Sequence, residues 1–290
     1  DPLVALQMAT INTATHFGLE RELGSITPGR RADVILTPDL VTLPIHRVIA
    51  RGVTVAMDGR LMVDCPHYAW PPEVRRTVNL ARPVSAQDFV VHAPAGRNRL
   101  KARVIGVVEN QAPTRALTAE LDVKDGVVEP DERQDIARIA LVERHRGTGG
   151  VVNGFVSGFG YRGRMALAST VAHDSHHMIV VGTSRDDMAA AANRLAGIGG
   201  GVTLWKDGAE IACVPLPIAG LMSDSPAQEV AGAAQRMVEA MAEVGCTLNN
   251  AYMQHSLLAL VVIPELRISD LGLVDVRSFE ITDLFEGETA

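Results

Sequence analysis

Residues 24–36 read Gly-Ser-Ile-Thr-Pro-Gly-Arg-Arg-Ala-Asp-Val-Ile-Leu, and this stretch decides how the first part of the chain folds. Pro28-Gly29 marks a turn, and residues 32–36 form a short apolar run typical of a buried strand. Upstream, apolar side chains recur at helical spacing over residues 3–17, and Gly18 stands where a helix ends. The pattern predicts a helix, a turn and a strand.

More strand signals follow this segment. Residues 48–56 and 60–63 each read as one strand, and Asp58-Gly59 between them is typical of a tight hairpin turn. Proline breaks helices and central strands, so the next stretch predicts a connecting segment with at most an edge strand over residues 88–92. Its prolines are Pro66, Pro71, Pro72, Pro83 and Pro94.

From residue 101 onward, strand and helix signals alternate. Helices are predicted from Asp131 to Gly147, from Ser184 to about Gly199, and from a capping box at Ser225 to Gly245. Asp207-Gly208 is the strongest short hairpin signal in the chain. Strands are predicted over residues 103–108, 178–182, 202–205 and 211–214.

Composition excludes several classes of protein. With 290 residues, 47% of them hydrophobic and 21% charged, the chain is expected to be globular with room for two domains. Its longest aliphatic runs, such as residues 257–263, are far shorter than the roughly 20 residues of a membrane span. Three dispersed cysteines predict reduced thiols and a cytoplasmic location. A net charge of −7 without basic clusters argues against nucleic acid as a partner.

The turn and strand of residues 24–34, preceded by Ala9-Thr-Ile-Asn12 and His16-Phe-Gly-Leu19, resemble the closing segment of metal-dependent amidohydrolases. In that family the segment follows the last helix of a (β/α)8 barrel and leads back to a β-sandwich. The resemblance implies that residues 1–17 are that last helix and residues 18–66 part of the sandwich. Residues 67–100 then form the connecting segment.

Further motifs resemble the C-terminal domain of the bacterial adenine deaminase family, and all the matches together cover nearly the whole chain. They imply that residues 101–290 form an α+β domain, so that the chain mixes α/β and α+β elements. The motifs are Asn110-Gln-Ala-Pro-Thr114, Glu143-Arg-His-Arg-Gly-Thr-Gly-Gly150, Asn153-Gly-Phe-Val-Ser-Gly-Phe-Gly160, Ala172-His-Asp-Ser-His-His177 and Thr247-Leu-Asn-Asn-Ala-Tyr-Met-Gln-His-Ser256.

This resemblance implies an enzyme of purine salvage that hydrolyses adenine to hypoxanthine and ammonia with a hydroxide activated by Mn, Fe or Zn. The family builds its metal site partly from a His-x-His on a barrel strand, where side chains two residues apart point the same way. None of the nine histidines here lies two residues from another. The principal metal ligands are therefore expected upstream of Asp1, and this chain alone is expected to be inactive.

The densest group of potential catalytic side chains is His173, Asp174, His176 and His177. On a helix the three histidines would share a face and could bind a metal. The flanking β-branched and apolar residues favour a turn between strands, in which one or two of them converge. Three roles stay open: a hydrogen-bonded turn, a contribution to the purine pocket or metal site of the parent enzyme, and an independent metal site.

Candidate residues for binding the substrate adenine lie elsewhere. Asn249, Asn250, Gln254 and His255 form a polar patch before an apolar run read as a strand, and amides can read a purine edge, although Asn-Asn also suits a turn. Asn153 and Ser157 are two further candidates within a family motif.

Other features have simpler explanations. Gly158-Phe-Gly-Tyr-Arg-Gly163 satisfies a dinucleotide-binding pattern but lacks the following helix, so a glycine-rich turn is the better interpretation. The remaining histidines, including His46, His67 and His145, are expected to be surface or core residues. A homo-oligomer is expected. The alternative function is a binding or assembly module without catalytic residues.

Overall fold

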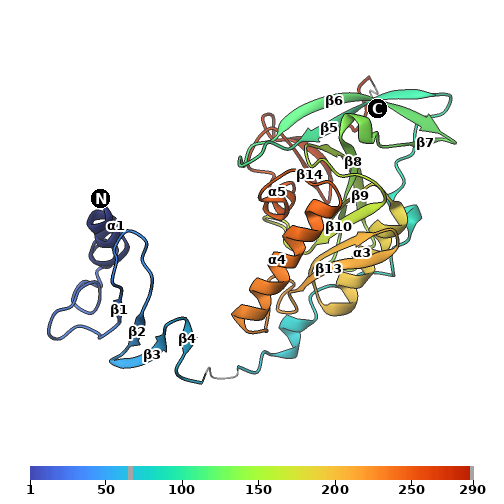
Figure 1. Cartoon of the computed structure of the whole chain (residues 1–290). Helices are drawn as coiled ribbons and strands as arrows, with labels where there is room; N and C mark the ends of the chain where they lie inside the picture. Colours follow the sequence, from blue (N-terminus) through green and yellow to red (C-terminus); the bar gives the residue numbers. More distant parts are fainter. Residues whose placement is uncertain (65–67, 288–290) are drawn as a thin grey trace. The chain divides into compact units, whose positions relative to one another are not determined.

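The computed structural model describes residues 1–64 and 68–287 (Figure 1). The chain divides into two compact units, which we call unit 1 (Asp1–Ala69) and unit 2 (Trp70–Ala290). Helices and several sheets occur together, so the mixed α and β class is confirmed. None of the described helices is long and apolar enough to cross a membrane.

Unit 1 begins with the predicted helix. The segments α1 (Pro2–Gln7), the π-helical η1 (Met8–Asn12) and α2 (Thr13–His16) follow one another without a break in helical backbone. The Asp1 side chain caps the start by accepting a hydrogen bond from the Leu3 amide, at 2.8 Å. Gly18 follows the end with φ of +69°, the left-handed conformation expected after a helix.

A four-stranded antiparallel sheet completes unit 1, in the order β1-β2-β3-β4. Asp58-Gly59 forms the predicted turn, with φ of +47° and +75°. The single strand predicted over residues 48–56 is wrong, because Arg51-Gly52, with φ of +49° and +80°, folds it into two paired strands. The strands are β1 (Val34–Leu36), β2 (Arg47–Ala50), β3 (Val53–Met57) and β4 (Arg60–Leu61).

Most apolar side chains of unit 1 are exposed. Among its described residues only Ala14 is buried. Large apolar residues, which normally pack inside a domain, face outward from the helix, from the loops and from the sheet. The most exposed are Ile26, Val41 and Phe17.

Unit 2 is built on a nine-stranded sheet in the order β13-β12-β10-β11-β8-β9-β5-β6-β7. Its neighbouring strands run antiparallel except for β5 and β9, which are parallel. The strands are β5 (Arg99–Gly106), β6 (Arg115–Lys124), β7 (Val127–Val128), β8 (Ile136–Val142), β9 (Val151–Ser157), β10 (Met165–Ser169), β11 (Met178–Gly182), β12 (Gly201–Lys206) and β13 (Ala209–Pro215).

Helices cover both faces of this sheet. On β8, Ala140 and Val142 join the core cluster formed with α3 (Arg185–Ile198), whereas Ile139 and Leu141 join the cluster formed with α4 (Ala227–Glu243). The helix predicted from Asp131 is therefore wrong. A strand buried on both faces reads as a continuous apolar run, so alternation does not reveal it. Asp131 caps only a short 3-10 turn, η4 (Glu132–Gln134).

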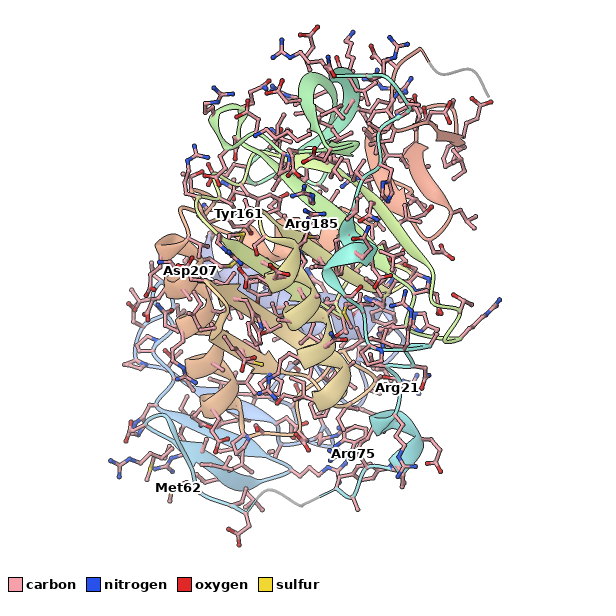
Figure 2. The ribbon with its side chains drawn as sticks, turned by 90° about the vertical axis from the view of Figure 1, so that its right-hand side faces the viewer. Arg21, Met62, Arg75, Tyr161, Arg185 and Asp207 are labelled. Atoms are coloured by element: carbon pink, nitrogen blue, oxygen red, sulfur yellow. The ribbon has the colours of Figure 1, made fainter. Side chains whose placement is uncertain are left out.

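The predicted α3 and the β12–β13 hairpin are confirmed. Ser184 caps α3 and Gly199 ends it in the left-handed conformation. Asp207-Gly208 turns the hairpin with φ of +51° and +83°. Figure 2 labels Asp207 in this turn and Arg185 at the start of α3. Helix α4 forms as predicted but without the capping box, because its N-cap residue is Pro226.

Other short segments differ from the sequence-based predictions. The edge strand expected over residues 88–92 is wrong, since η3 (Ala86–Phe89) is a 3-10 turn and His92 makes a single bridge to Val127. The strand expected after the polar patch is wrong: the apolar run of residues 257–263 starts at the last residue of helix α5 (Ala251–Leu257) and continues as turns. The remaining elements are η2 (Pro72–Arg75) and the small sheet of β14 (Leu266–Ser269), β15 (Gly272–Asp275) and β16 (Glu280–Thr282).

Candidate functional site

Residues 170–177 join β10 to β11, which confirms the turn predicted around His173, His176 and His177. The turn is closed by two hydrogen bonds: the His176 amide donates to the Ala172 carbonyl at 2.6 Å, and the Ala172 amide donates to Nδ1 of His176 at 3.2 Å. Because Nδ1 of His176 accepts, its Nε2 carries the proton of the neutral ring.

The loop after β8 lies beside this turn, because Val142 of β8 pairs with Met178 of β11. His145 on this loop has its Nε2 at 2.8 Å from the Ser175 carbonyl, and its ring centre lies 4.7 Å from that of His177. The rings of His173 and His176 lie 5.4 Å apart. We call His145, His173, His176 and His177 the histidine cluster.

A buried cation supports the cluster. The Arg144 guanidinium, with the residue only 1% exposed, donates to the carbonyls of His176, Thr77 and Ala219 at 2.5, 2.9 and 3.2 Å. Burial lowers the pKa of Arg144 to about 10, so it stays charged at neutral pH. Carbonyl dipoles rather than a carboxylate compensate this charge.

Two histidines of the turn, His176 and His177, are held neutral. Burial, together with the nearby His173 and Arg144, lowers the pKa of His176. Burial and His145 lower the pKa of His177, although Asp270, whose Oδ2 lies 3.7 Å from Nε2 of His177, opposes the shift. A neutral imidazole offers one donor and one acceptor, which suits binding to a neutral heterocycle better than pairing with an anion.

Glu143 organises the loop that carries His145. Its carboxylate accepts hydrogen bonds from the amides of His145, Arg146 and Thr148, at 2.5, 2.7 and 2.9 Å, and from the Thr148 hydroxyl. Burial alone would raise the pKa of Glu143, but these hydrogen bonds outweigh it and hold the pKa at about 2. The loop is therefore folded around an internal anion.

Two ring nitrogens of the cluster are buried without a hydrogen-bond partner among the described residues, Nδ1 of His173 and Nδ1 of His177. Such atoms usually bind a protein group, water or a ligand. Within residues 1–64 and 68–287, however, no three His, Cys, Asp or Glu side chains lie close enough together to hold a metal ion. The described residues therefore do not fit a catalytic metal, and Asp174 is an exposed residue of the turn.

Asn153 and Ser157 lie outside the histidine cluster. Both are on β9, where Asn153 donates from Nδ2 to the Asp88 carbonyl at 2.9 Å while its Oδ1 is buried without a partner in the described chain. Ser157 pairs with Ile136, at the end of β8 opposite to Glu143. The structure thus does not bring these two residues to the cluster.

The four polar residues near position 250 do not form one patch. Asn249 and Asn250 are exposed before α5 and line a small cavity, whereas Gln254 and His255 are buried on α5 itself. Burial lowers the pKa of His255 to about 3, so its ring is neutral. The cluster is nevertheless close to the end of α5, because the His173 amide donates to the Ser256 carbonyl at 3.0 Å.

The glycine-rich segment 158–163 is a turn between β9 and β10, as interpreted from the sequence. The Asp135 carboxylate accepts from the amides of Gly158 and Gly160, both at 2.8 Å. These are the amides that a phosphate would need. Tyr161 of this turn, labelled in Figure 2, is buried against Phe159, with parallel rings 4.9 Å apart.

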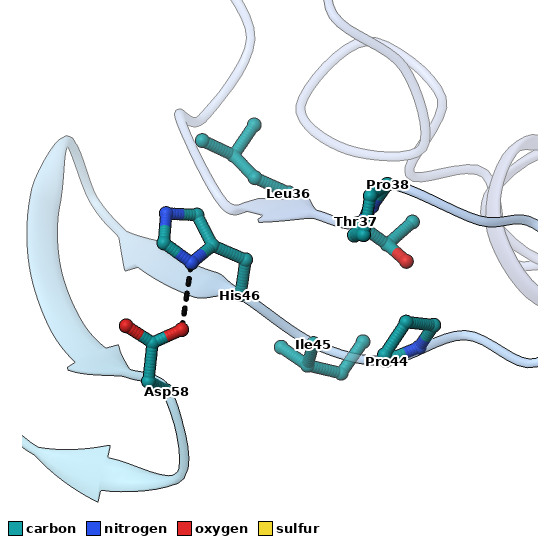
Figure 3. Close-up of a pocket in the computed structure, with 7 residues that line it drawn as sticks. All are labelled: Leu36, Thr37, Pro38, Pro44, Ile45, His46 and Asp58. Atoms are coloured by element: carbon teal, nitrogen blue, oxygen red, sulfur yellow. Dashed lines mark hydrogen bonds and ion pairs between the residues drawn. The ribbon is translucent and has the colours of Figure 1, made fainter.

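Unit 1 has its own surface pocket, shown in Figure 3. Nδ1 of His46 and Oδ1 of Asp58 lie 2.7 Å apart at its edge, and both side chains are at least half exposed. The rest of the lining is mostly apolar, formed by Leu36, Thr37, Pro38, Pro44 and Ile45. His67, another expected surface histidine, lies outside the described residues.

Sequence reasoning did not predict the roles of Arg144, His145 and Asp270. His145 was interpreted as an isolated histidine, although the motif of residues 143–150 around it was noted for its family resemblance. Pairing of β8 with β11 brings it to the cluster. Because β8 was predicted as a helix, that pairing could not be anticipated.

Residues 111–280 match the family model of the adenine deaminase C-terminal domain, which spans more than half of the chain. The chain belongs to this family. Residues 1–62 of this adenine deaminase C-terminal chain also match the amidohydrolase family. The resemblance inferred from the motifs is therefore confirmed.

Curated relatives show the same similarity. The chain is 74% identical over 287 residues to an adenine deaminase of Ruegeria pomeroyi, covering 99% of this chain and 48% of the relative. It is 60% identical over 284 residues to one of Mesorhizobium japonicum, covering 98% and 47%. It is 46% identical over 287 residues to one of Moorella thermoacetica, covering 99% and 48%. The chain thus spans about half the length of these relatives.

Proposed function

We propose that this chain is part of an adenine deaminase, an enzyme that hydrolyses adenine to hypoxanthine and ammonia in purine salvage. The observation that carries the proposal is the high identity to relatives of that name, which extends over nearly all 290 residues and over about half the length of those relatives. The match of unit 1 to the amidohydrolase family supports hydrolysis as the reaction class.

The parent reaction needs a divalent metal, which we expect to be Mn, Fe or Zn and which activates water when bound. The described residues do not fit such a metal. We therefore propose that the principal ligands belong to the part of the enzyme that precedes Asp1 and that these 290 residues alone do not deaminate adenine.

The histidine cluster is the part of this chain that we propose contributes to the adenine pocket. The lowered pKa values of His176 and His177 and the two unpartnered ring nitrogens support this role. His145 donates from Nε2 to the Ser175 carbonyl. His176 keeps a proton on Nε2. The cluster thus presents ring nitrogens from the turn and from the neighbouring loop, suited to orienting a neutral purine and to holding a proton near it.

The test compares the chain with the complete enzyme. The purified 290-residue chain is assayed for ammonia release from adenine and for bound Mn, Fe and Zn. It is then mixed with the separately produced first half of the Ruegeria pomeroyi relative. We expect no turnover and no stoichiometric metal in the chain alone, and turnover after mixing. Deamination by the chain alone would refute the proposal that its metal site lies elsewhere.

A second test addresses the cluster in the reconstituted enzyme. Replacing His173, His176 and His177 with Ala should lower adenine turnover, whereas the matched control His92→Ala, at an exposed position, should not. If turnover is unchanged and the oligomer size changes instead, the chain serves as an assembly module. We further propose a cytoplasmic homo-oligomer, and the free thiols of Cys213 and Cys246 support the cytoplasmic location.

A further inference from the structure

A small cavity lies between α4 and α5, at the opposite end of α5 from the histidine cluster. Its volume is about 120 Å³. Pockets for drug-sized ligands usually enclose about 300–1,000 Å³, so this one admits a single small ring system. It is lined by Val238, Met241, Ala242, Cys246, Leu248, Asn249, Asn250, Ala251 and Tyr252.

The inner walls of the cavity are apolar. Met241 and Ala251 are buried, while Cys246 and Leu248 are partly buried against the main core. Tyr252 stays 38% exposed and also borders a second, apolar cavity of about 240 Å³. Aromatic, aliphatic and sulfur-bearing side chains of this kind pack well against the faces of a planar ring.

Two amides stand at the rim without partners. Neither the Asn249 nor the Asn250 side chain makes a hydrogen bond within the described part of the chain. Asn250 is the N-cap residue of α5, a position at which an Asn side chain ordinarily accepts from the first turn, yet it does not cap the helix. Each free amide offers both an acceptor oxygen and donor hydrogens, which can pair with the edge of a heterocycle.

The charges around the cavity select against an anionic ligand. Among the described residues no Lys or Arg lines it, and the Glu109 carboxylate lies beside it, with Oε1 accepting from the Asn249 amide at 3.1 Å. Burial raises the pKa of Cys246, and Asp135 and Glu109 add to this effect, so the thiol stays neutral. The cavity therefore suits a neutral molecule rather than a phosphate ester.

From these observations we propose that the α4–α5 cavity binds one neutral nucleobase, with its ring between the apolar walls and its polar edge on Asn249 and Asn250. This site is distinct from the histidine cluster. Helix α5 has seven residues and is therefore roughly 10 Å long, which separates the cavity from Ser256 and the cluster. Binding here needs no turnover, so the proposal does not depend on the proposed function.

The experiment measures binding of adenine and hypoxanthine to the 290-residue chain by calorimetry, with indole as an apolar ring and adenosine monophosphate as a charged analogue. We expect both bases to bind with one-to-one stoichiometry and the monophosphate to bind at least about tenfold more weakly. Changing both Asn249 and Asn250 to Leu should weaken base binding at least about tenfold and leave indole binding unchanged.

Two controls keep the result interpretable. Asn98→Leu, at an exposed position elsewhere in unit 2, should leave base binding unchanged, and Ala242→Phe should block the cavity for both bases and indole. Absence of base binding would overturn the proposal. So would equal binding of the monophosphate, or base binding that the Asn249 and Asn250 changes do not affect.

Discussion

Replacing Glu143 with Gln tests whether an internal anion holds together the loop beside the histidine cluster. In the folded chain, Oε1 accepts from two backbone amides, and Oε2 accepts from the Thr148 amide and hydroxyl. Gln has the same shape but keeps only one acceptor oxygen. Its amide nitrogen would face donors, so one pair of hydrogen bonds would be lost and replaced by a repulsive contact.

The magnitude follows from the pKa of Glu143, which falls from 4.5 to about 2 on folding. This difference corresponds to about 3 kcal/mol of stabilisation by the ionised group at pH 7. Because the folded pKa is the lower one, the contribution is complete well above pH 4.5 and is lost as the pH falls towards 2. At pH 3 a little under half of this stabilisation should remain.

Tryptophan fluorescence during urea unfolding measures this effect in unit 2 alone, because the only two tryptophans, Trp70 and Trp205, both belong to it. We expect Glu143→Gln to lower the free energy of unfolding by about 3 kcal/mol at pH 7 and by about half as much at pH 3. Glu239→Gln, at an exposed position on α4, is the control and should change it by less than about 0.5 kcal/mol. A Glu143→Gln effect below about 1 kcal/mol at pH 7, or one that is the same at both pH values, would refute the reasoning.

Two other variants probe the core and the opening motif. The fully buried His255 has a pKa of about 3, so the unfolded chain takes up a proton below pH 6.5 that the folded chain refuses. As the pH is lowered from 8 to 4.5, the parent should therefore lose about 3 kcal/mol of unfolding free energy that His255→Leu keeps, measured by the same fluorescence assay. Equal losses in both proteins would contradict this. In unit 1, a Cβ on Gly24 would lie 2.9 Å from Ala14 Cβ and from Ile11 Cα, whereas Gly29 faces open space, and both have positive φ. Gly24→Ala should therefore speed amide hydrogen exchange in residues 2–16 far more than Gly29→Ala, and equal effects would show that the close contact does not hold the helix.

Local sequence signals were sufficient to predict the elements whose structure is determined by residues close to one another in the sequence. The helix before Gly18, the turns at Asp58-Gly59 and Asp207-Gly208, and the cap of α3 at Ser184 follow from residues within a few positions of each other. The same holds for the turn that carries His173, because the β-branched residues on both sides favour strands rather than a helix.

Tertiary packing determined the elements that the sequence pattern predicted wrongly. In β8 both faces are buried, so the strand lacks the alternation that distinguishes it from a helix. The sequence carries a capping signal at Ser225, yet Pro226 is the N-cap residue and no side chain caps the helix by a hydrogen bond. The histidine cluster depends on the same non-local pairing: only the register of β8 against β11 places His145 beside His177.

The two units differ in a way that bears on the proposed function. Unit 2 contains three buried core clusters, and β8 contributes residues to the clusters on both faces of the sheet. Unit 1 has one buried residue among those described, while fixing a backbone costs about 1–2 kcal/mol per residue. At about 25 cal/mol per Å² of apolar surface, a unit that leaves most of its large apolar side chains in water cannot offset that entropy by itself. Its fold therefore needs another protein surface against the helix and the sheet, which is the relation expected if unit 1 belongs to a larger catalytic domain.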